Sequence, residues 1–378
     1  MKKLLAIILA LASILALVAC AGNGASNTTA PGASTPPATT TPAGFELALI
    51  TDLGTIDDKS FNQGAWEGLE KYAKEKNITH KYYKPADQGD DAYLNAIDQA
   101  VQGGAKVIVT PGYLFEIPIY KAQDIYPNVK FILLDGAPND GDWSNGAPTE
   151  KVGANTVAIT YAEEQSGFLA GYAAVKDGYR KLGFLGGMSV PAVVRFGHGY
   201  VQGANLAAEE LGLADGAITM NYFYTGVFAP SPDIQTMAAA WYNEGVEVIF
   251  SCGGGICFSI FPAAEQAGKF VIGVDGDQSG ESTTVITSAK KELAQSVYDK
   301  IANFYANSFP GGKKEVYTAA NNGVGLPMNT SKFKTFTQAE YDAIYAKLQS
   351  GAVKVDNGID VTPDQLPTSK VKVTYLGG

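Results

Sequence analysis

Histidine and cysteine are scarce in this sequence, and their scarcity excludes several kinds of chemistry. The 378 residues include only two histidines, His80 and His198, too few for a multi-histidine metal site or for histidine-based acid–base catalysis. Three cysteines are too few for a disulfide scaffold. The P-loop, His-Glu-x-x-His and Gly-x-Ser-x-Gly motifs are all absent. We therefore predict that the chain is not an enzyme and binds no cofactor.

Basic residues are also in short supply. Lysine and arginine number 28 against 38 aspartates and glutamates, so the formal net charge is -10 at pH 7. This balance disfavours a nucleic-acid partner or an anionic lipid surface, both of which attract basic proteins. Hydrophobic residues make up 46% of the chain, enough for more than one core. At a typical ~100–200 residues per domain, the length predicts two domains.

The first twenty residues are typical of an export signal. Lys2 and Lys3 precede an apolar run, residues 4–18, which is shorter than the ~20 residues that span a bilayer. The sequence Leu-Val-Ala-Cys at 17–20 resembles a lipobox, which predicts a signal peptide over 1–19 and lipidation of Cys20. The alternative is an ordinary secretion signal with a chance cysteine. With two or three acyl chains the anchor would be stable, which predicts a lipid-anchored protein that faces outside the cytoplasm.

Residues 21–44 contain only Ala, Gly, Asn, Ser, Thr and Pro. Without large apolar side chains, such a stretch cannot offset the entropy lost on ordering. We expect residues 20–44 to be a lipidated, solvated tether that reaches at most ~80 Å. A stalk of this kind indicates a partner at the membrane or a ligand outside the cell, although tethered hydrolases also use one.

From residue 45 onward, apolar runs alternate with helical segments, a rhythm typical of βαβ units and parallel sheets. The pattern restarts after residue 165, which predicts an α/β fold with two doubly wound parallel-sheet lobes joined by a hinge. We expect the N-terminal lobe to hold 45–160 plus about 276–320, and the C-terminal lobe 161–275 plus about 321–378. The predicted strands are 46–51, 80–84, 106–110, 130–135, 181–186, 217–224, 246–251 and 270–275.

In open parallel sheets, ligands bind beyond the carboxyl ends of the strands, so the residues that follow each strand are candidates for a site. Asp52, Asp135 and Asp275 occupy such positions and can accept hydrogen bonds from sugar hydroxyls or amines. Gly253 follows another strand and permits close backbone approach. The alternative is that these are ordinary turn residues.

Several of these turns resemble a known family. Residues 50–63, Ile-Thr-Asp-Leu-Gly-Thr-Ile-Asp-Asp-Lys-Ser-Phe-Asn-Gln, are similar to the opening motif of the basic membrane protein family, the substrate-binding lipoproteins of ABC transporters that include purine nucleoside receptors. Further motifs follow in the family's order at 126–131, 184–188, 196–200 and 274–278. The resemblance spans most of 45–307. It implies a type I periplasmic-binding-protein fold, a monomer, a purine nucleoside ligand, and ABC permease and ATPase partners.

The resemblance also implies a set of ligand-binding residues. Phe61 and Phe196 are similar to the two aromatic rings, one per lobe, that sandwich the purine; their alternative role is hydrophobic core. Asn62 would pair with a purine edge, or else cap a helix. Asp275 would anchor the ribose together with Lys291, since charge-assisted hydrogen bonds to hydroxyls are strong. The neighbouring Lys290 could take this role instead, or Lys291 could be an ordinary surface lysine. Asp52 would accept from ligand hydroxyls or hold its own turn together.

Three features depart from the family pattern. Only Glu116 is left, after the third strand, to read a base edge. The loop 225–230, Thr-Gly-Val-Phe-Ala-Pro, is more apolar than its counterpart in the family. Cys252 and Cys257 flank a glycine-rich loop; they could form a disulfide or remain buried thiols, whereas a metal site would lack ligands.

Two other functions fit parts of the sequence. The aspartates between 52 and 58 resemble those of a nucleoside hydrolase, although an acidic pair near a helix start is already favoured by the helix dipole. A tethered sensor that presents a bound sugar or nucleoside to a receptor is the other alternative.

Overall fold

The computed structural model describes residues 44–377, and residues 42–378 form one compact unit. The predicted signal peptide, the lipidated Cys20 and the tether, apart from its last residue, lie outside the described residues. Within 44–377, no helix is both long enough and apolar enough to cross a membrane.

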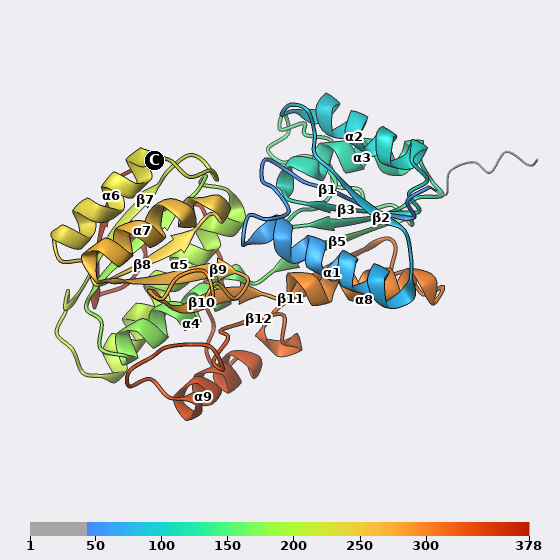
Figure 1. Cartoon of the computed structure of the whole chain (residues 1–378). Coiled ribbons are helices and arrows are strands. Elements are labelled where there is room, and N and C mark those ends of the chain that lie inside the picture. Colours follow the sequence, from blue (N-terminus) through green and yellow to red (C-terminus); the bar gives the residue numbers. More distant parts are fainter. Residues whose placement is uncertain (1–43, 378) are drawn as a thin grey trace, which may run out of the picture. The chain divides into compact units, whose positions relative to one another are not determined.

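The first sheet has six strands in the order β11-β5-β4-β3-β1-β2, all paired in parallel. Figure 1 shows helices on both of its faces, α1 and α8 on one and α2 and α3 on the other. The strands are β1 (Leu47–Ile50), β2 (His80–Tyr83), β3 (Val107–Pro111), β4 (Lys130–Leu134), β5 (Thr156–Tyr161) and β11 (Lys313–Tyr317). The helices are α1 (Phe61–Lys76), α2 (Asp90–Gln102), α3 (Glu116–Ile125) and α8 (Leu293–Tyr305).

The second sheet has seven strands in the order β12-β10-β9-β8-β6-β7-β13, and only the short β12 is antiparallel. The pair α4 and α5 packs in one core and the pair α6 and α7 in another. The strands are β6 (Lys181–Gly186), β7 (Ile218–Tyr224), β8 (Val248–Cys252), β9 (Phe270–Asp275), β10 (Val285–Lys291), β12 (Val324–Gly325) and β13 (Val371–Tyr375). The helices are α4 (Glu163–Lys176), α5 (Pro191–Glu210), α6 (Pro232–Asn243), α7 (Cys257–Ala267) and α9 (Gln338–Gln349).

The predicted fold class is confirmed: the described chain is α/β, with two largely parallel sheets each covered by helices. We call the two sheets with their helices the first and second lobes. The chain passes between them three times, after β5, after β10 and after β11.

One expected boundary is wrong. We expected the chain to return to the first lobe at about residue 276, but β10 pairs in parallel with β9 and so belongs to the second lobe. The return comes with α8, after Lys291. The end of β10, Thr-Ser-Ala-Lys-Lys, is too polar to be typical of a buried strand, yet Ala289 packs in the core and Lys291 is buried at the cavity.

Helices α4 and α5 approach each other unusually closely, and glycines make this possible. A Cβ on Gly167, Gly171, Gly199 or Gly203 would overlap a backbone carbonyl of the opposite helix. Each helix therefore carries a Gly-x3-Gly stripe at the crossing. The close packing fixes the N-terminal end of α4, with Glu163, beside Arg195 and Phe196 of α5.

Candidate functional site

A cavity of about 750 Å³ lies at the carboxyl ends of the strands and is lined by residues from both lobes. Seven of the eight residues predicted to bind ligand line it: Asp52, Phe61, Asn62, Phe196, Gly253, Asp275 and Lys291. The volume falls in the range of small-molecule sites, ~300–1,000 Å³. The rule that ligands bind at strand carboxyl ends therefore locates the cavity correctly.

Lys291, the last residue of β10, stands at the centre of the polar side chains. Its Nζ donates to Asp135 Oδ2 of the first lobe at 2.6 Å and lies 3.3 Å from Asp275 Oδ1 of the second. It is also 4.0 Å from Glu163 Oε1. The rings of Phe61, Tyr161 and Phe196 surround the ammonium, with centroids at 4.4, 5.4 and 5.5 Å.

The side chains of this cluster are almost completely buried from solvent. Lys291 exposes 3% of its side chain, Asp275 8% and Asp135 9%. Burial raises the pKa of Asp135, against the lowering effect of Lys291. Burial alone would lower the pKa of Lys291, but Asp135, Asp275 and Glu163 outweigh it and raise that pKa. The lysine is therefore held as a cation, and Oδ1 of Asp135 remains without a hydrogen-bond partner among the described residues.

The two aspartates occupy matching places in the two lobes. Asp135 follows β4 in Lys-Phe-Ile-Leu-Leu-Asp-Gly, and Asp275 ends β9 in Lys-Phe-Val-Ile-Gly-Val-Asp-Gly. Both have left-handed backbone, with φ of 57° and 65°. Non-glycine residues adopt this conformation at a cost, and such strain is typical of ligand sites. These two similar strand ends thus place one carboxylate from each lobe beside Lys291.

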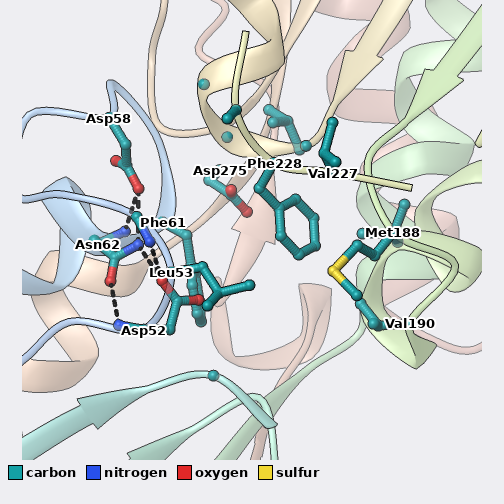
Figure 2. A pocket seen from close by; sticks show the side chains of 18 of the residues that line it. Asp52, Leu53, Asp58, Phe61, Asn62, Met188, Val190, Val227, Phe228 and Asp275 are labelled. Carbon is teal, nitrogen blue, oxygen red and sulfur yellow. Dashed lines mark hydrogen bonds between the residues drawn. The ribbon is translucent and has the colours of Figure 1, made fainter. Parts of the chain in front are cut away.

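Asp52 and Asp58 are joined by Asn62 at the first-lobe side of the cavity (Figure 2). Nδ2 of Asn62 donates to Asp52 Oδ1 and to Asp58 Oδ2, both at 2.9 Å, and its Oδ1 accepts from the Asp52 N–H at 3.3 Å. The amide of Asn62 is thus already occupied, so Asn62 positions the carboxylates rather than presenting a free edge. Burial raises the pKa of Asp52 to about 6.

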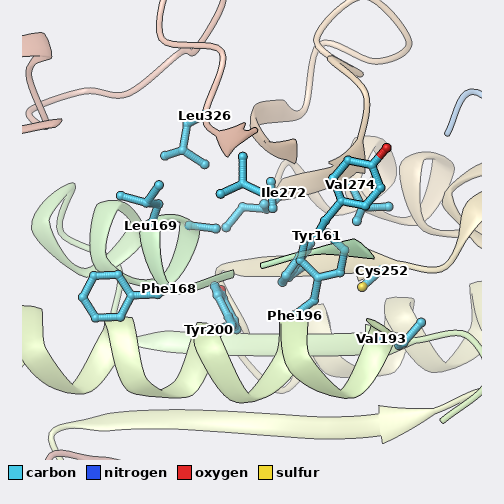
Figure 3. Packing of buried hydrophobic residues seen from close by; sticks show 14 of the residues in the cluster. Tyr161, Phe168, Leu169, Val193, Phe196, Tyr200, Cys252, Ile272, Val274 and Leu326 are labelled. Carbon is cyan, nitrogen blue, oxygen red and sulfur yellow. The ribbon is translucent and has the colours of Figure 1, made fainter. Parts of the chain in front are cut away.

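Phe61 and Phe196 have different surroundings. Phe61 is half-buried at the start of α1 and faces the cavity, whereas Phe196 is 1% exposed and packs edge to face on Phe250 at 6.0 Å. Figure 3 shows Phe196 within a hydrophobic cluster that also contains Tyr161, Val274 and Cys252. In this structure Phe196 is a core residue that touches the cavity.

Phe228 is the second-lobe aromatic residue that projects into the cavity, between Asp275 and Met188 (Figure 2). Its ring lies on the backbone of Gly187, where a Cβ would overlap it. From the sequence, the loop 225–230 stands out only as apolar. The signal that could have identified Phe228 is its place in the loop that follows β7, the same criterion of lying beyond a strand end that selected the aspartates.

Gly253 lines the cavity and allows the turn after β8 to approach the turn after β6. A Cβ there would lie 2.7 Å from the backbone nitrogen of Gly187. Cys252 and Cys257 are both buried free thiols, so the open question between a disulfide and free thiols is answered in favour of the latter.

Glu116 is not a cavity residue, contrary to the prediction. Its carboxylate accepts from the Ala137 N–H and from Asn139 Nδ2, both at 3.0 Å. It lies at the first turn of α3 and braces the loop that follows Asp135. These hydrogen bonds occupy the carboxylate of Glu116, and the position of Glu116 in the sequence does not reveal them.

Direct contacts also join the two lobes beside the cavity. Gln278 Nε2 donates to the Lys59 carbonyl at 2.8 Å, and its Oε1 accepts from the Val274 N–H at 3.1 Å. The Ser60 hydroxyl donates to Asp275 Oδ2. We call Lys59, Ser60, Asp275 and Gln278 the interlobe latch.

Known proteins are similar to this chain over most of its length. The Lactococcus lactis protein named ABC transporter nucleoside-binding protein BmpA is 30% identical over 374 residues, covering 92% of this chain and 98% of that protein. Basic membrane protein A1 of Borrelia garinii is 29% identical, covering 80% of this chain and 86% of that protein.

Solved structures show the same fold. A solute-binding protein of an ABC transporter system from Aeropyrum pernix superposes with a TM-score of 0.65 at 23% identity, covering 85% of this chain and 83% of that one. One from Conexibacter woesei gives 0.64 at 23% identity, covering 82% and 98%. The expected type I periplasmic-binding fold is thereby confirmed.

The family itself is established by the match over most of the sequence. Residues 45–357 match the Bmp family, described as "ABC transporter substrate-binding protein PnrA-like". Together with the related sequences, this match shows that the chain belongs to the Bmp family of ABC transporter substrate-binding proteins.

Proposed function

We propose that the chain binds a nucleoside between its two lobes and delivers it, unaltered, to an ABC permease. The observation that carries this proposal is Lys291 held between Asp135 and Asp275, beside a cavity with an aromatic ring from each lobe. A sugar offers hydroxyls to such carboxylates, and a base offers a flat face to such rings. The name of the Lactococcus relative, a nucleoside-binding protein, supports the same ligand class.

In this proposal the base stacks between Phe61 and Phe228. Stacking of a base on an aromatic side chain contributes ~1–3 kcal/mol and depends little on the identity of the base. A purine covers more of both rings than a pyrimidine does, so we expect a purine nucleoside to bind more tightly. Phe196 supports the cluster around Lys291 from the core instead.

The ribose hydroxyls lie in this proposal against Asp275 and Asp135. Each carboxylate accepts hydrogen bonds from hydroxyls, and Lys291 donates to a hydroxyl oxygen while it holds both carboxylates in place. Asp135 Oδ1, buried and unpartnered among the described residues, is available for this purpose. Asp52 accepts from a base N–H and is oriented for that role by Asn62.

The charge of the cavity favours an uncharged ligand. Asp52, Asp57, Asp58, Asp135 and Asp275 line it against Lys84 and Lys291. Lys291 is already paired with carboxylates, so a phosphate would meet repulsion without a free buried cation. Nucleosides should therefore bind in preference to nucleotides.

Neither hydrolysis nor sensing is favoured by a specific observation. The carboxylate oxygens of Asp58 accept hydrogen bonds from Ser60, Asn62 and Gln63 of its own turn, so they are engaged rather than free to hold a metal ion. This engagement argues against the arrangement of clustered aspartates that a nucleoside hydrolase needs.

Lipidation of Cys20 would place the monomeric chain outside the cytoplasm, within reach of permease and ATPase subunits in the membrane.

The test is isothermal titration calorimetry of the purified chain with adenosine, guanosine, inosine, uridine and adenosine monophosphate. We expect binding of the purine nucleosides and at least tenfold weaker binding of the monophosphate, where tenfold corresponds to about 1.4 kcal/mol. Mass spectrometry after incubation should recover the nucleoside intact. No binding by any nucleoside, or release of a free base, would contradict the proposal.

A further inference from the structure

The cavity has two chemically different sides, as Figure 2 shows. Asp52, Asp58 and Asn62 lie on the first-lobe side, with Asp275 near the centre. The opposite side is formed by the turns after β6, β7 and β8 of the second lobe. None of the cavity-lining residues on these three turns is charged. We call Met188, Val190 and Val227 of these turns, together with Phe258 at the start of α7, the apolar wall.

The apolar wall is open to solvent. Val227 is 44% exposed and Phe258 42%, although both line a cavity. Apolar surface of this kind is normally buried on binding, because removing it from water is favourable. The remaining lining of the three turns is glycine, alanine, proline and other apolar residues, so it contains no charged side chain that could pair with an ionic group.

The wall is also preformed. The Gly187 N–H donates to the Cys252 carbonyl at 2.9 Å, and the Gly226 N–H donates to the Gly187 carbonyl at 3.1 Å. The Thr225 hydroxyl donates to the Val227 carbonyl at 3.0 Å. These bonds tie the three turns to one another before any ligand arrives. A fixed apolar surface can therefore discriminate between ligands by shape as well as by polarity.

We propose that the apolar wall is a specificity subsite for an uncharged apolar substituent carried by the ring ligand. The inference rests on the proposed function and deepens it: the preferred ligands are nucleosides with an alkyl, thioalkyl or aryl group rather than the parent nucleosides. The cavity volume of about 750 Å³ lies in the upper part of the usual range, ~300–1,000 Å³, and leaves room for such a group.

The test compares adenosine with two analogues that carry the apolar group at different ends, 5′-deoxy-5′-methylthioadenosine and N6-benzyladenosine. Calorimetry of the full chain should show at least one analogue bound about tenfold more tightly than adenosine, the gain expected for burying roughly two methylene equivalents. In the variant V227S/F258S this gain should fall to less than about threefold. Leu211→Ser, at an equally exposed position outside the cavity, is the matched control and should retain the full gain.

The outcomes separate the two proposals. If adenosine binds but neither analogue binds more tightly, the subsite inference is overturned while nucleoside binding stands. A gain that persists in V227S/F258S overturns the inference as well. If no nucleoside or analogue binds, the proposed function itself fails. Thermal melts of each variant ensure that a lost gain reflects the subsite and not unfolding.

Discussion

At the scale of single residues, the site depends on which aromatic and acidic side chains reach the cavity and which are used elsewhere. Strand-end position predicted the aspartates and Gly253, because parallel strands bring their carboxyl ends together whatever the details of packing. The choice of Phe196 instead came from the family resemblance, which does not show how deeply that ring is buried. Phe196 sits on a helix whose glycines let it sink against α4, and that burial is a tertiary effect.

Phe228→Ala should therefore reduce ligand affinity, whereas Phe196→Ala should reduce the stability of the fold. Removing the Phe228 ring should weaken nucleoside binding by the stacking contribution, ~1–3 kcal/mol, with little change in melting temperature. Removing the buried Phe196 ring should reduce the free energy of unfolding by ~3–5 kcal/mol. Calorimetry and thermal denaturation of both variants provide the measurements. A normal affinity in Phe228→Ala would show that the ring is not a stacking partner.

Glu164, next to the buried cluster, should make stability depend on pH. It is 6% exposed, and burial, with a contribution from Glu163, raises its pKa to about 7. The folded state thus holds this proton more tightly than the unfolded state does. The stabilisation is complete below about pH 4.5 and is lost as the pH rises through 7, at an order-of-magnitude cost of 3 kcal/mol.

Glu164→Gln removes this titration. Compared with the wild type, the variant should gain stability progressively between pH 5 and pH 8, which urea unfolding at several pH values would measure. Gln295→Ala, at an exposed position, removes no titratable group; as the control it should give a stability difference that does not change with pH. An equally constant difference for Glu164→Gln would show that this group does not titrate in the range.

At the scale of elements, the close crossing of α4 and α5 positions one end of the cavity. The alternation of apolar runs with helical segments predicts helices here without giving their bounds, and the structure starts α5 at Pro191. The Gly-x3-Gly stripes were visible in the sequence, but which surfaces they bring together follows only from the sheet order. The short edge strands β11, β12 and β13 have weak apolar patterns, so the sequence does not show where they pair.

Gly203→Ala tests this crossing. The added methyl group would overlap the Phe168 carbonyl, and forcing the helices apart should cost ~1–3 kcal/mol or more of unfolding free energy. It should also weaken ligand binding, because Glu163 and Arg195 come from the two helices. Gly280→Ala, with open space around its Cα and no positive φ, should be nearly neutral. Equal stability of the two variants by chemical denaturation would count against the packing argument.

At the scale of the whole molecule, the interlobe latch links the relative placement of the lobes to the site. Gln278 is 1% exposed, and it connects the strand end that carries Asp275 to the turn that carries Ser60. In the proposed function, a state in which both lobes contact the ligand is the one that the permease would distinguish from the empty state. Bonds that join the lobes directly would favour that state even before ligand binds.

Gln278→Ala should shift the ligand-free chain toward separated lobes. Small-angle X-ray scattering should give a larger radius of gyration without ligand and a return to the wild-type value at saturating nucleoside, with weaker affinity. Gln295→Ala removes an exposed glutamine outside the latch and should change neither quantity. An unchanged radius in Gln278→Ala would mean that the latch does not hold the lobes together.

The three passages between lobes have a consequence for biosynthesis. The edge strand β11 of the first lobe and the edge strand β13 of the second both come from the last part of the chain, at 313–317 and 371–375. During synthesis β5 lacks its outer neighbour until residues 313–317 have emerged, and β7 lacks its neighbour until residues 371–375 have emerged. A product truncated before residue 371 would therefore expose the edge of β7 and should aggregate more readily than the full chain.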